Sequence, residues 1–431
     1  MPPDADDAAS DPAASPSAAA EHRVTVHGIT HGMEGVARLP DGRACFVPFA
    51  LPGETIDLVV NETRARWARG RLVDVVEASP DRVAPPCPYA GPWPAAPPAC
   101  GGCALQHVRP EAQPHLKRRV LVEQLERIGR QPDPPVTEPV PTGPWHYRSR
   151  ARFAVDEQGR LGFREPRSHD VRPIDRCPLL TPDAQALRDA AGDAWPGVES
   201  VEVHAGSAGG GGLLVRPGAD ALPPLPEAPS AIAVVDAGPP VALRGDPTAH
   251  ETVAGLPLQV SAGVFFQAGQ EAAEALVATV RRGAGDVAGR HVLDLYAGVG
   301  LFAAALAADG AHVTAVEHHR GAVSDARASL AGSSATVVSA DVGAWLAEHA
   351  DEEEADVVVL DPPRRGAGPA VCEALPRLRA GRVVYVSCDP AALARDARTL
   401  VEGGATLTEV VPVDCFPHTA AVEAVATFAL P

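Results

Sequence analysis

The chain has 431 residues, 45% of them hydrophobic, and a formal net charge of −18 at pH 7. This length suffices for two or three domains. No apolar run reaches the roughly 18–20 residues that span a bilayer, and the N-terminus lacks a signal-peptide pattern, so we expect a cytoplasmic protein without a membrane partner. The acidic total argues against nucleic-acid binding, because contacts to phosphate need cations.

The charges are unevenly distributed along the chain. Residues 309–361 contain eleven acidic side chains and two arginines, a net of −9. Residues 109–176 contain fourteen basic and ten acidic side chains, a net of +4. A local basic face therefore remains compatible with the sequence, as does an ordinary solvated surface.

The N-terminal part combines a polar tail with short β-like runs. Residues 1–20 are mostly Ala, Pro, Ser and Asp, which predicts a disordered tail. Residues 21–80 alternate strand-like runs with turn signals, which predicts a small β-barrel of the kind to which oligonucleotide-binding folds belong. Four arginines surround Trp67, a pattern that suits RNA but equally a solvated strand edge.

We expect a central α/β domain over residues 81–255. Apolar spacing predicts a helix over residues 111–130, and this helix is a candidate for packing on the C-terminal domain. Residues 147–178 have strand-like alternation and eight arginines, an arginine-rich face. The Gly- and Pro-rich residues 206–229 are expected to form a surface loop.

Four cysteines of this region are candidate metal ligands. Thiols in a cytosolic chain favour metal over disulfide, and four of them accept either Zn²⁺ or a [4Fe–4S] cluster. Their spacing does not choose between the two. The candidates are Cys87, Cys100, Cys103 and Cys177.

Residues 256–431 alternate strand and helix patterns, which predicts a doubly wound parallel sheet. The first expected strand, residues 290–295, contains Asp294 and leads into a Gly-rich turn that contains Tyr296 and Gly298. Glu317 ends the second strand and can accept hydrogen bonds from both ribose hydroxyls of a nucleotide. Asp341, after the third strand, can reach an adenine amino group. This arrangement favours S-adenosylmethionine over NAD.

The most distinctive feature is Cys388, which follows the apolar run 383–386 at an expected strand end. Asp361 ends another strand and begins a rigid Pro-Pro-Arg-Arg loop. Carbon 5 of uracil becomes nucleophilic only after something adds to carbon 6, and a thiolate suits that role. Removal of the carbon 5 proton then needs a general base, for which Glu423 is the candidate. His418 is expected to act as a second acid or base, or to shape its loop.

The chain resembles the RNA 5-methyluridine methyltransferase family over residues 22–431. The resemblance rests on the barrel motifs Gly32-Met33-Glu34-Gly35-Val36-Ala37, Phe46-Val47-Pro48 and Leu51-Pro52-Gly53-Glu54, on Phe265-Phe266-Gln267, and on the segments around Asp294, Asp361, Cys388 and Glu423.

The resemblance implies an S-adenosylmethionine-dependent enzyme that methylates carbon 5 of a uridine in tRNA or 23S rRNA. It implies an N-terminal TRAM barrel, a central α/β domain and a Rossmann-like methyltransferase domain. Cys388 would be the nucleophile and Glu423 the base. Cofactor contacts would come from Gln267, Tyr296, Glu317, Asp341 and Asp361, and Phe265 would stack on the target base.

The same resemblance makes the four thiols ligands of a [4Fe–4S] cluster. The family usually has fewer residues between its first two cluster cysteines than the twelve found between Cys87 and Cys100. Cys415 stands where methionine is common, and Ala420-Ala421 where histidine is common. No obligatory protein partner is expected. The alternatives are a DNA cytosine-C5 methyltransferase and a catalytically inactive RNA-binding module.

Overall fold

A computed structural model describes residues 21–91, 100–218, 222–229, 231–236 and 238–431. The predicted tail, residues 1–20, lies outside the described residues. The chain divides into two units, one containing residues 1–80 and 91–97, the other residues 81–90 and 98–431. Among the described helices, none combines the length and the apolar character that a membrane crossing requires.

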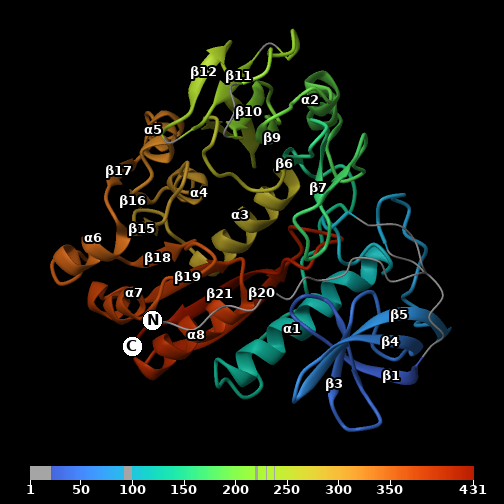
Figure 1. Cartoon of the computed structure of the whole chain (residues 1–431). Helices are drawn as coiled ribbons and strands as arrows, with labels where there is room; N and C mark the ends of the chain where they lie inside the picture. Colours follow the sequence, from blue (N-terminus) through green and yellow to red (C-terminus); the bar gives the residue numbers. More distant parts are fainter. Residues whose placement is uncertain (1–20, 92–99, 219–221, 230, 237) are drawn as a thin grey trace, which may run out of the picture. The chain divides into compact units, whose positions relative to one another are not determined.

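The first unit is a closed five-stranded barrel in the order β1-β2-β3-β5-β4 (Figure 1). Alternate side chains such as Val24, Val26, Ile56 and Leu58 point inward and are buried, as a half-buried strand pattern dictates. The strands are β1 (His22–Ile29), β2 (Gly35–Arg38), β3 (Ala44–Val47), β4 (Thr55–Thr63) and β5 (Trp67–Glu77).

The second unit contains a central seven-stranded sheet in the order β12-β11-β10-β9-β6-β7-β8, with helix α2 (Pro182–Ala191) beside it. Its core includes Phe153, Leu161, Trp195 and Val201. The strands are β6 (Arg150–Val155), β7 (Leu161–Arg164), β8 (Val171–Pro173), β9 (Val198–Ala205), β10 (Gly211–Pro217), β11 (Ile232–Val234) and β12 (Val241–Arg244).

The expected surface loop over residues 206–229 is wrong in its first half, where β10 forms a buried strand between β9 and β11. The glycines serve the turn before this strand. Gly211 has φ 98°, and a Cβ there would lie 2.0 Å from the carbonyl oxygen of His204. Glycine content therefore reflects a close backbone approach, not an unstructured loop.

The C-terminal sheet has the order β17-β16-β15-β18-β19-β21-β20, preceded by the hairpin of β13 (Ala249–Val253) and β14 (Leu256–Val260). Strands β15 to β19 are parallel, and β21 pairs antiparallel with both β19 and β20. The strands are β15 (His291–Leu295), β16 (His312–Glu317), β17 (Ala335–Ser339), β18 (Val357–Leu360), β19 (Arg382–Ser387), β20 (Thr406–Val413) and β21 (Glu423–Ala429).

Both faces of this sheet are buried, as expected for a parallel sheet that helices cover. Val357 and Val359 share a core with α3, α4 and α5, whereas Val358 and Leu360 are buried on the other face. The helices are α3 (Gln270–Ala284), α4 (Leu301–Ala308), α5 (Arg320–Ser329), α6 (Val342–His349), α7 (Pro369–Ala374) and α8 (Pro390–Glu402), with 3₁₀ turns at Pro110–Ala112 and Leu375–Leu378. The predicted fold class, a Rossmann-like domain with an N-terminal barrel and a central α/β domain, is confirmed.

Helix α1 (Gln113–Arg127) precedes the central sheet in sequence but packs on α8 and β20 of the C-terminal sheet (Figure 1). Lys117, the one lysine in the sequence, projects from α1 and forms a buried ion pair with Asp414, at 2.6 Å. The chain after α1 then runs alongside β20, where Val136 and Val140 bridge to Val410 and Val413.

Candidate active site

Cys388 and Glu423 lie at adjoining ends of two paired strands. Cys388 directly follows β19, and Glu423 begins β21. The antiparallel register pairs Ser387 with Ala424, so one further step places the thiol opposite the carboxyl group. Asp389 caps α8 by accepting a hydrogen bond from the Ala392 N–H at 2.7 Å, which turns the chain from strand to helix immediately after the thiol.

The pKa values of these two groups depend on Asp361 and Arg364, which follow the neighbouring strand β18. Burial, together with Glu423 and Asp361 and against the opposing effect of Arg364, raises the pKa of the Cys388 thiol to about 11. Burial, reinforced by Asp361, raises the pKa of Glu423 well above its ordinary value, and Arg364 and Lys117 act against this rise. Burial raises the pKa of Asp361 to about 7. The site therefore favours protonated carboxyl groups and a protonated thiol when no ligand is bound.

The turn after β15 is held by two carboxylates. Asp294 accepts a hydrogen bond from the Ala303 N–H at 2.8 Å and so fixes the start of α4. Glu317 accepts the N–H of Gly298 at 3.0 Å. Tyr296 and Gly298 have φ values of 61° and 56°, a conformation that glycine adopts without strain, and a Cβ on Gly298 would meet nothing within 4 Å. The turn thus presents backbone to open space.

The side chains predicted to bind the cofactor occupy carboxyl ends of adjacent parallel strands. Tyr296 follows β15, Glu317 ends β16, and Asp361 follows β18. Asp341 lies after β17 and is the N-cap residue of α6. Burial raises the pKa of Tyr296 to about 12, and Asp341 adds to this rise. These groups fit S-adenosylmethionine, because carboxylates accept hydrogen bonds from ribose hydroxyls and an adenine amino group.

Phe265 and Gln267 lie on the segment between β14 and α3. Phe265 is 69% exposed, although Val264 and Phe266 beside it are 3% and 5% exposed. The Gln267 side chain is buried. The segment therefore projects one aromatic ring outward and directs its polar amide inward.

The four candidate ligand thiols line a single pocket in the central region. Cys87, Cys100, Cys103 and Cys177 all contribute to its wall. The Gly102 N–H donates to the Cys100 sulfur at 3.4 Å, and the Gln106 amide donates to the Cys103 sulfur at 3.3 Å. Burial raises the pKa values of Cys100 and Cys103 to about 11 and about 12, and the neighbouring thiols add to both rises.

No group of three His, Cys, Asp or Glu side chains in the described part of the chain converges closely enough to hold one metal ion. The N–H donors beside Cys100 and Cys103 suit anionic sulfur, as ligands of a metal centre would be.

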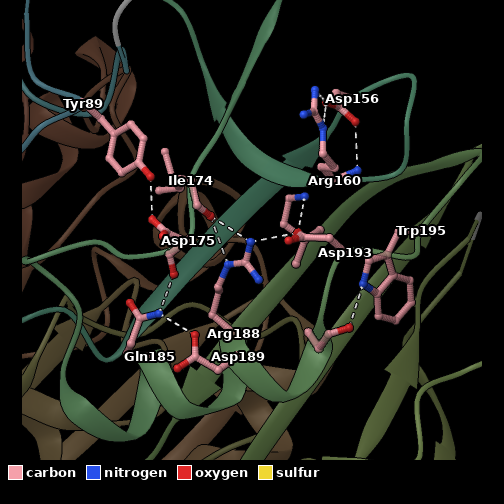
Figure 2. A network of polar contacts seen from close by, with 12 residues as sticks. Tyr89, Asp156, Arg160, Ile174, Asp175, Gln185, Arg188, Asp189, Asp193 and Trp195 are labelled. Carbon is pink, nitrogen blue, oxygen red and sulfur yellow. Dashed lines mark hydrogen bonds and ion pairs between the residues drawn. The ribbon is translucent and has the colours of Figure 1, made fainter.

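A polar network joins the segments that carry two of these thiols (Figure 2). The Tyr89 hydroxyl donates to Asp175 at 2.5 Å, which connects the segment of Cys87 to that of Cys177. Gln185 of α2 donates to the Asp175 carbonyl at 2.9 Å and accepts the Cys177 N–H at 3.1 Å. The pocket is therefore anchored to α2 through hydrogen bonds that do not involve sulfur.

His418 lies in a loop-shaping position. Its side chain is 1% exposed and stacks on Trp145 with ring centroids 4.0 Å apart. Gln113 of α1 contacts both its ring, at 3.0 Å, and its backbone N–H, at 2.6 Å. Burial lowers the pKa of His418 to about 4, which leaves the ring neutral at physiological pH.

Sequence reasoning did not find Lys117, whose ammonium group also donates to the Phe416 carbonyl at 2.8 Å. A single lysine within an apolar helical stripe was the available signal. Sequence reasoning also did not identify Arg364 as the cation beside Cys388 and Glu423. The other cysteines, Cys45, Cys372 and Cys415, are buried.

Comparisons with known proteins agree with this architecture. Residues 20–73 match the TRAM domain, and residues 255–380 match the methyltransferase small domain. An uncharacterized RNA methyltransferase of Streptomyces coelicolor is 37% identical over 94% of this chain and 92% of its own length. A 23S rRNA (uracil(1939)-C(5))-methyltransferase of Alkalilimnicola ehrlichii is 35% identical over 94% and 96%.

A solved structure has a similar fold over almost the whole chain. The tRNA (uracil-54, C5)-methyltransferase of Pyrococcus abyssi, in complex with S-adenosyl-L-homocysteine, superimposes with a TM-score of 0.73 and is 25% identical, over 95% of this chain and 100% of that one. Because the chain contains both domains and its relatives match over 94% of its length, it belongs to the TRAM-containing family of RNA (uracil-C5) methyltransferases.

Proposed function

We propose that this enzyme transfers a methyl group from S-adenosylmethionine to carbon 5 of a uridine in RNA through a covalent Cys388 adduct. The observation that carries the proposal is the placement of Cys388 opposite Glu423 across the β19–β21 pair, beside the strand end that bears Asp361. A nucleophile and a base of raised pKa are the two groups that carbon 5 methylation requires.

In the proposed mechanism the target uridine is flipped out of its RNA context, and Phe265 stacks on the base. The Cys388 thiolate bonds to carbon 6, and the electron pair of the 5,6 double bond makes carbon 5 nucleophilic. Carbon 5 then bonds to the methyl group of S-adenosylmethionine, which the carboxyl groups at the strand ends and Gln267 would hold. The bond between this methyl group and the sulfonium sulfur breaks, and S-adenosylhomocysteine leaves. Glu423 then removes the proton from carbon 5, and the carbon–sulfur bond breaks to regenerate the double bond and the thiolate.

The raised pKa of Glu423 suits the last step, because a carboxylate of high pKa accepts a proton more readily than an ordinary one. The raised pKa of Cys388 suits formation of the adduct, because a thiolate of high pKa is a stronger nucleophile once formed.

The test is the Cys388→Ala variant with RNA that contains uridine or 5-fluorouridine. We expect loss of methylation and loss of the trapped protein–RNA complex, while S-adenosylmethionine still binds. Cys45→Ala, which removes a buried thiol of the barrel core, is the matched control and keeps both. Full turnover by Cys388→Ala would refute the nucleophile.

Labelled S-adenosylmethionine with total RNA or with DNA separates the proposal from its alternatives. Methyluridine in RNA supports it, methylcytosine in DNA identifies a cytosine methyltransferase, and no transfer identifies an inactive RNA-binding module. The relatives act on 23S rRNA and tRNA, so methyluridine mapping in both RNAs from a deletion strain identifies the target.

We also propose that Cys87, Cys100, Cys103 and Cys177 hold a [4Fe–4S] cluster. Support comes from their common pocket and from the donors aimed at two of the sulfurs. Protein purified without oxygen should be brown, and Cys103→Ser should lose the colour. A colourless, zinc-loaded preparation would contradict the cluster.

A further inference from the structure

The segment between β14 and α3 must hold Phe265 outward against the tendency of an aromatic ring to bury itself. Phe265 is 69% exposed, which is unusual for phenylalanine. Its neighbours Val264 and Phe266 are buried, so the backbone around the ring is anchored while the ring itself is not covered. The anchors are therefore the groups that decide where the ring points.

The C-terminal domain fixes the beginning of this segment. Asp325 of α5 accepts the Ser261 N–H at 2.7 Å and the Ser261 hydroxyl at 2.6 Å. Asp325 is fully buried, and Gln259 donates to it as well, at 3.0 Å. This anchor lies four residues before Phe265 and leaves the intervening backbone to be fixed elsewhere.

The central sheet fixes the segment on both sides of the ring. Arg150, at the start of β6, donates from its guanidinium group to the carbonyl oxygen of Val264. The N–H of Ser149 donates to the carbonyl oxygen of Ala268 at 3.0 Å. Ser149 and Arg150, two consecutive residues where β6 begins, thus hold one carbonyl group directly before Phe265 and one three residues after it.

A buried carboxylate orients the Arg150 side chain. Glu202 of β9 is 5% exposed and accepts a hydrogen bond from Arg150 Nε at 2.5 Å. Its other oxygen accepts from Arg152 at 3.1 and 3.0 Å. The Arg150 side chain is 16% exposed and that of Arg152 is 54% exposed. Arg150 therefore bridges Glu202 and Val264, which a planar guanidinium with donors on two edges can do.

We propose that Arg150 is a positioning residue that presents Phe265 to the target base, with Glu202 holding the guanidinium in place. The inference rests on the proposed function, because it assigns Phe265 the base-stacking role. Through the contact of Arg150 to the Val264 carbonyl group, the central sheet becomes part of the active site. Arg150 and Arg152 share the Glu202 carboxylate but have different tasks.

The chain offers a matched pair of variants. Arg150→Met and Arg152→Met each remove one positive charge that is paired with Glu202, and each leaves Glu202 with one arginine. Only Arg150→Met also removes the hydrogen bond to the Val264 carbonyl group. Misplacement of a reacting group by about 1 Å lowers a rate roughly 100-fold, so we expect kcat for RNA to fall about tenfold to 100-fold in Arg150→Met. We expect Arg152→Met to act on the KM for RNA and to keep kcat.

A double-mutant cycle with Phe265→Ala tests whether Arg150 acts through the ring. Once the ring is gone its positioning has no value, so Arg150→Met should lower kcat by less than about threefold in the Phe265→Ala background. Arg152→Met should instead leave kcat unchanged in the Phe265→Ala background as well. Affinity for S-adenosylmethionine and thermal unfolding report on folding of each variant.

If Arg150→Met does not fold, Arg150→Lys replaces it, because lysine keeps the positive charge but lacks the planar fork whose donors on two edges reach Glu202 and Val264. This variant should show the same coupling with Phe265. Equal kcat loss in Arg150→Met and Arg152→Met, or multiplicative effects of Arg150→Met and Phe265→Ala, would overturn the inference. Absence of methylation by the unsubstituted enzyme would instead overturn the proposed function.

Discussion

Lys117 Nζ lies 2.6 Å from Asp414 Oδ1, and both side chains are almost completely buried, at 3% and 4% exposure. The pair joins α1 to the end of β20, and the Phe416 carbonyl accepts a second hydrogen bond from the ammonium group. A buried charge without its partner is costly, because neither water nor an opposite charge compensates it.

We therefore expect Lys117→Met to lower the free energy of unfolding by roughly 3–5 kcal/mol, as removal of one partner of a buried pair does. Urea denaturation followed by circular dichroism measures the change. Lys117→Met combined with Asp414→Leu should lose less than Lys117→Met alone, since no charge is left unpaired. Equal stability of Lys117→Met and the unsubstituted protein would show that the pair contributes nothing.

Glu423→Gln should convert the enzyme into one that accumulates a covalent complex with ordinary uridine RNA. Glutamine keeps the shape of glutamate but cannot take the carbon 5 proton, so the methylated adduct persists. Denaturing gel electrophoresis with labelled RNA detects it, and the additional change Cys388→Ala should abolish it. Normal turnover by Glu423→Gln would identify a different base.

Alkylation of Cys388 by iodoacetamide should accelerate steadily with pH in the ligand-free enzyme. Because burial raises its pKa to about 11, the thiolate fraction should grow about tenfold per pH unit between roughly pH 7 and 9. Peptide mass spectrometry follows this cysteine separately from the others. Arg364 opposes the rise, so Arg364→Met should react more slowly at each pH. A plateau below about pH 8 would contradict the raised pKa.

Binding of S-adenosylmethionine should release protons at neutral pH. Burial raises the pKa of Asp361 to about 7 and that of Glu423 well above its usual range, so these carboxyl groups hold protons before binding. A sulfonium cation favours their ionised forms and lowers both pKa values. Calorimetry in buffers of different ionisation enthalpy counts the protons.

S-adenosylhomocysteine, a neutral thioether, is the control for this measurement and should release fewer protons. The Asp361→Asn variant should release fewer protons than the unsubstituted enzyme when S-adenosylmethionine binds. Equal proton counts for the two ligands would show that the carboxyl groups do not respond to the sulfonium charge.

Local patterns in the sequence predicted the fold class and the strands that lead to Asp294, Glu317 and Asp361, because strand periodicity and strand ends are local properties. The pairing of Cys388 with Glu423 depends on the insertion of β21 between β19 and β20, which joins residues far apart in the chain. The limits of the domains and the roles of the site residues stay predictions.

Other features were hidden because they arise only from tertiary packing. The destination of Lys117 depends on where α1 docks. The Glu202–Arg150–Val264 contact joins two strands of the central sheet to the segment between β14 and α3. The expected loop over residues 206–229 is wrong where β10 forms, because composition does not show that a buried strand follows the glycine-containing turn.

The docking of α1 determines where the polypeptide can be divided. A fragment that begins near residue 256 would expose the surface of β20 and α8 that this helix covers, and it would leave Asp414 without its cation. Cutting near residue 80, between the two units, leaves that surface intact. The smallest piece able to fold with a complete catalytic sheet therefore includes the whole central region, and a Rossmann-like half expressed alone should be insoluble.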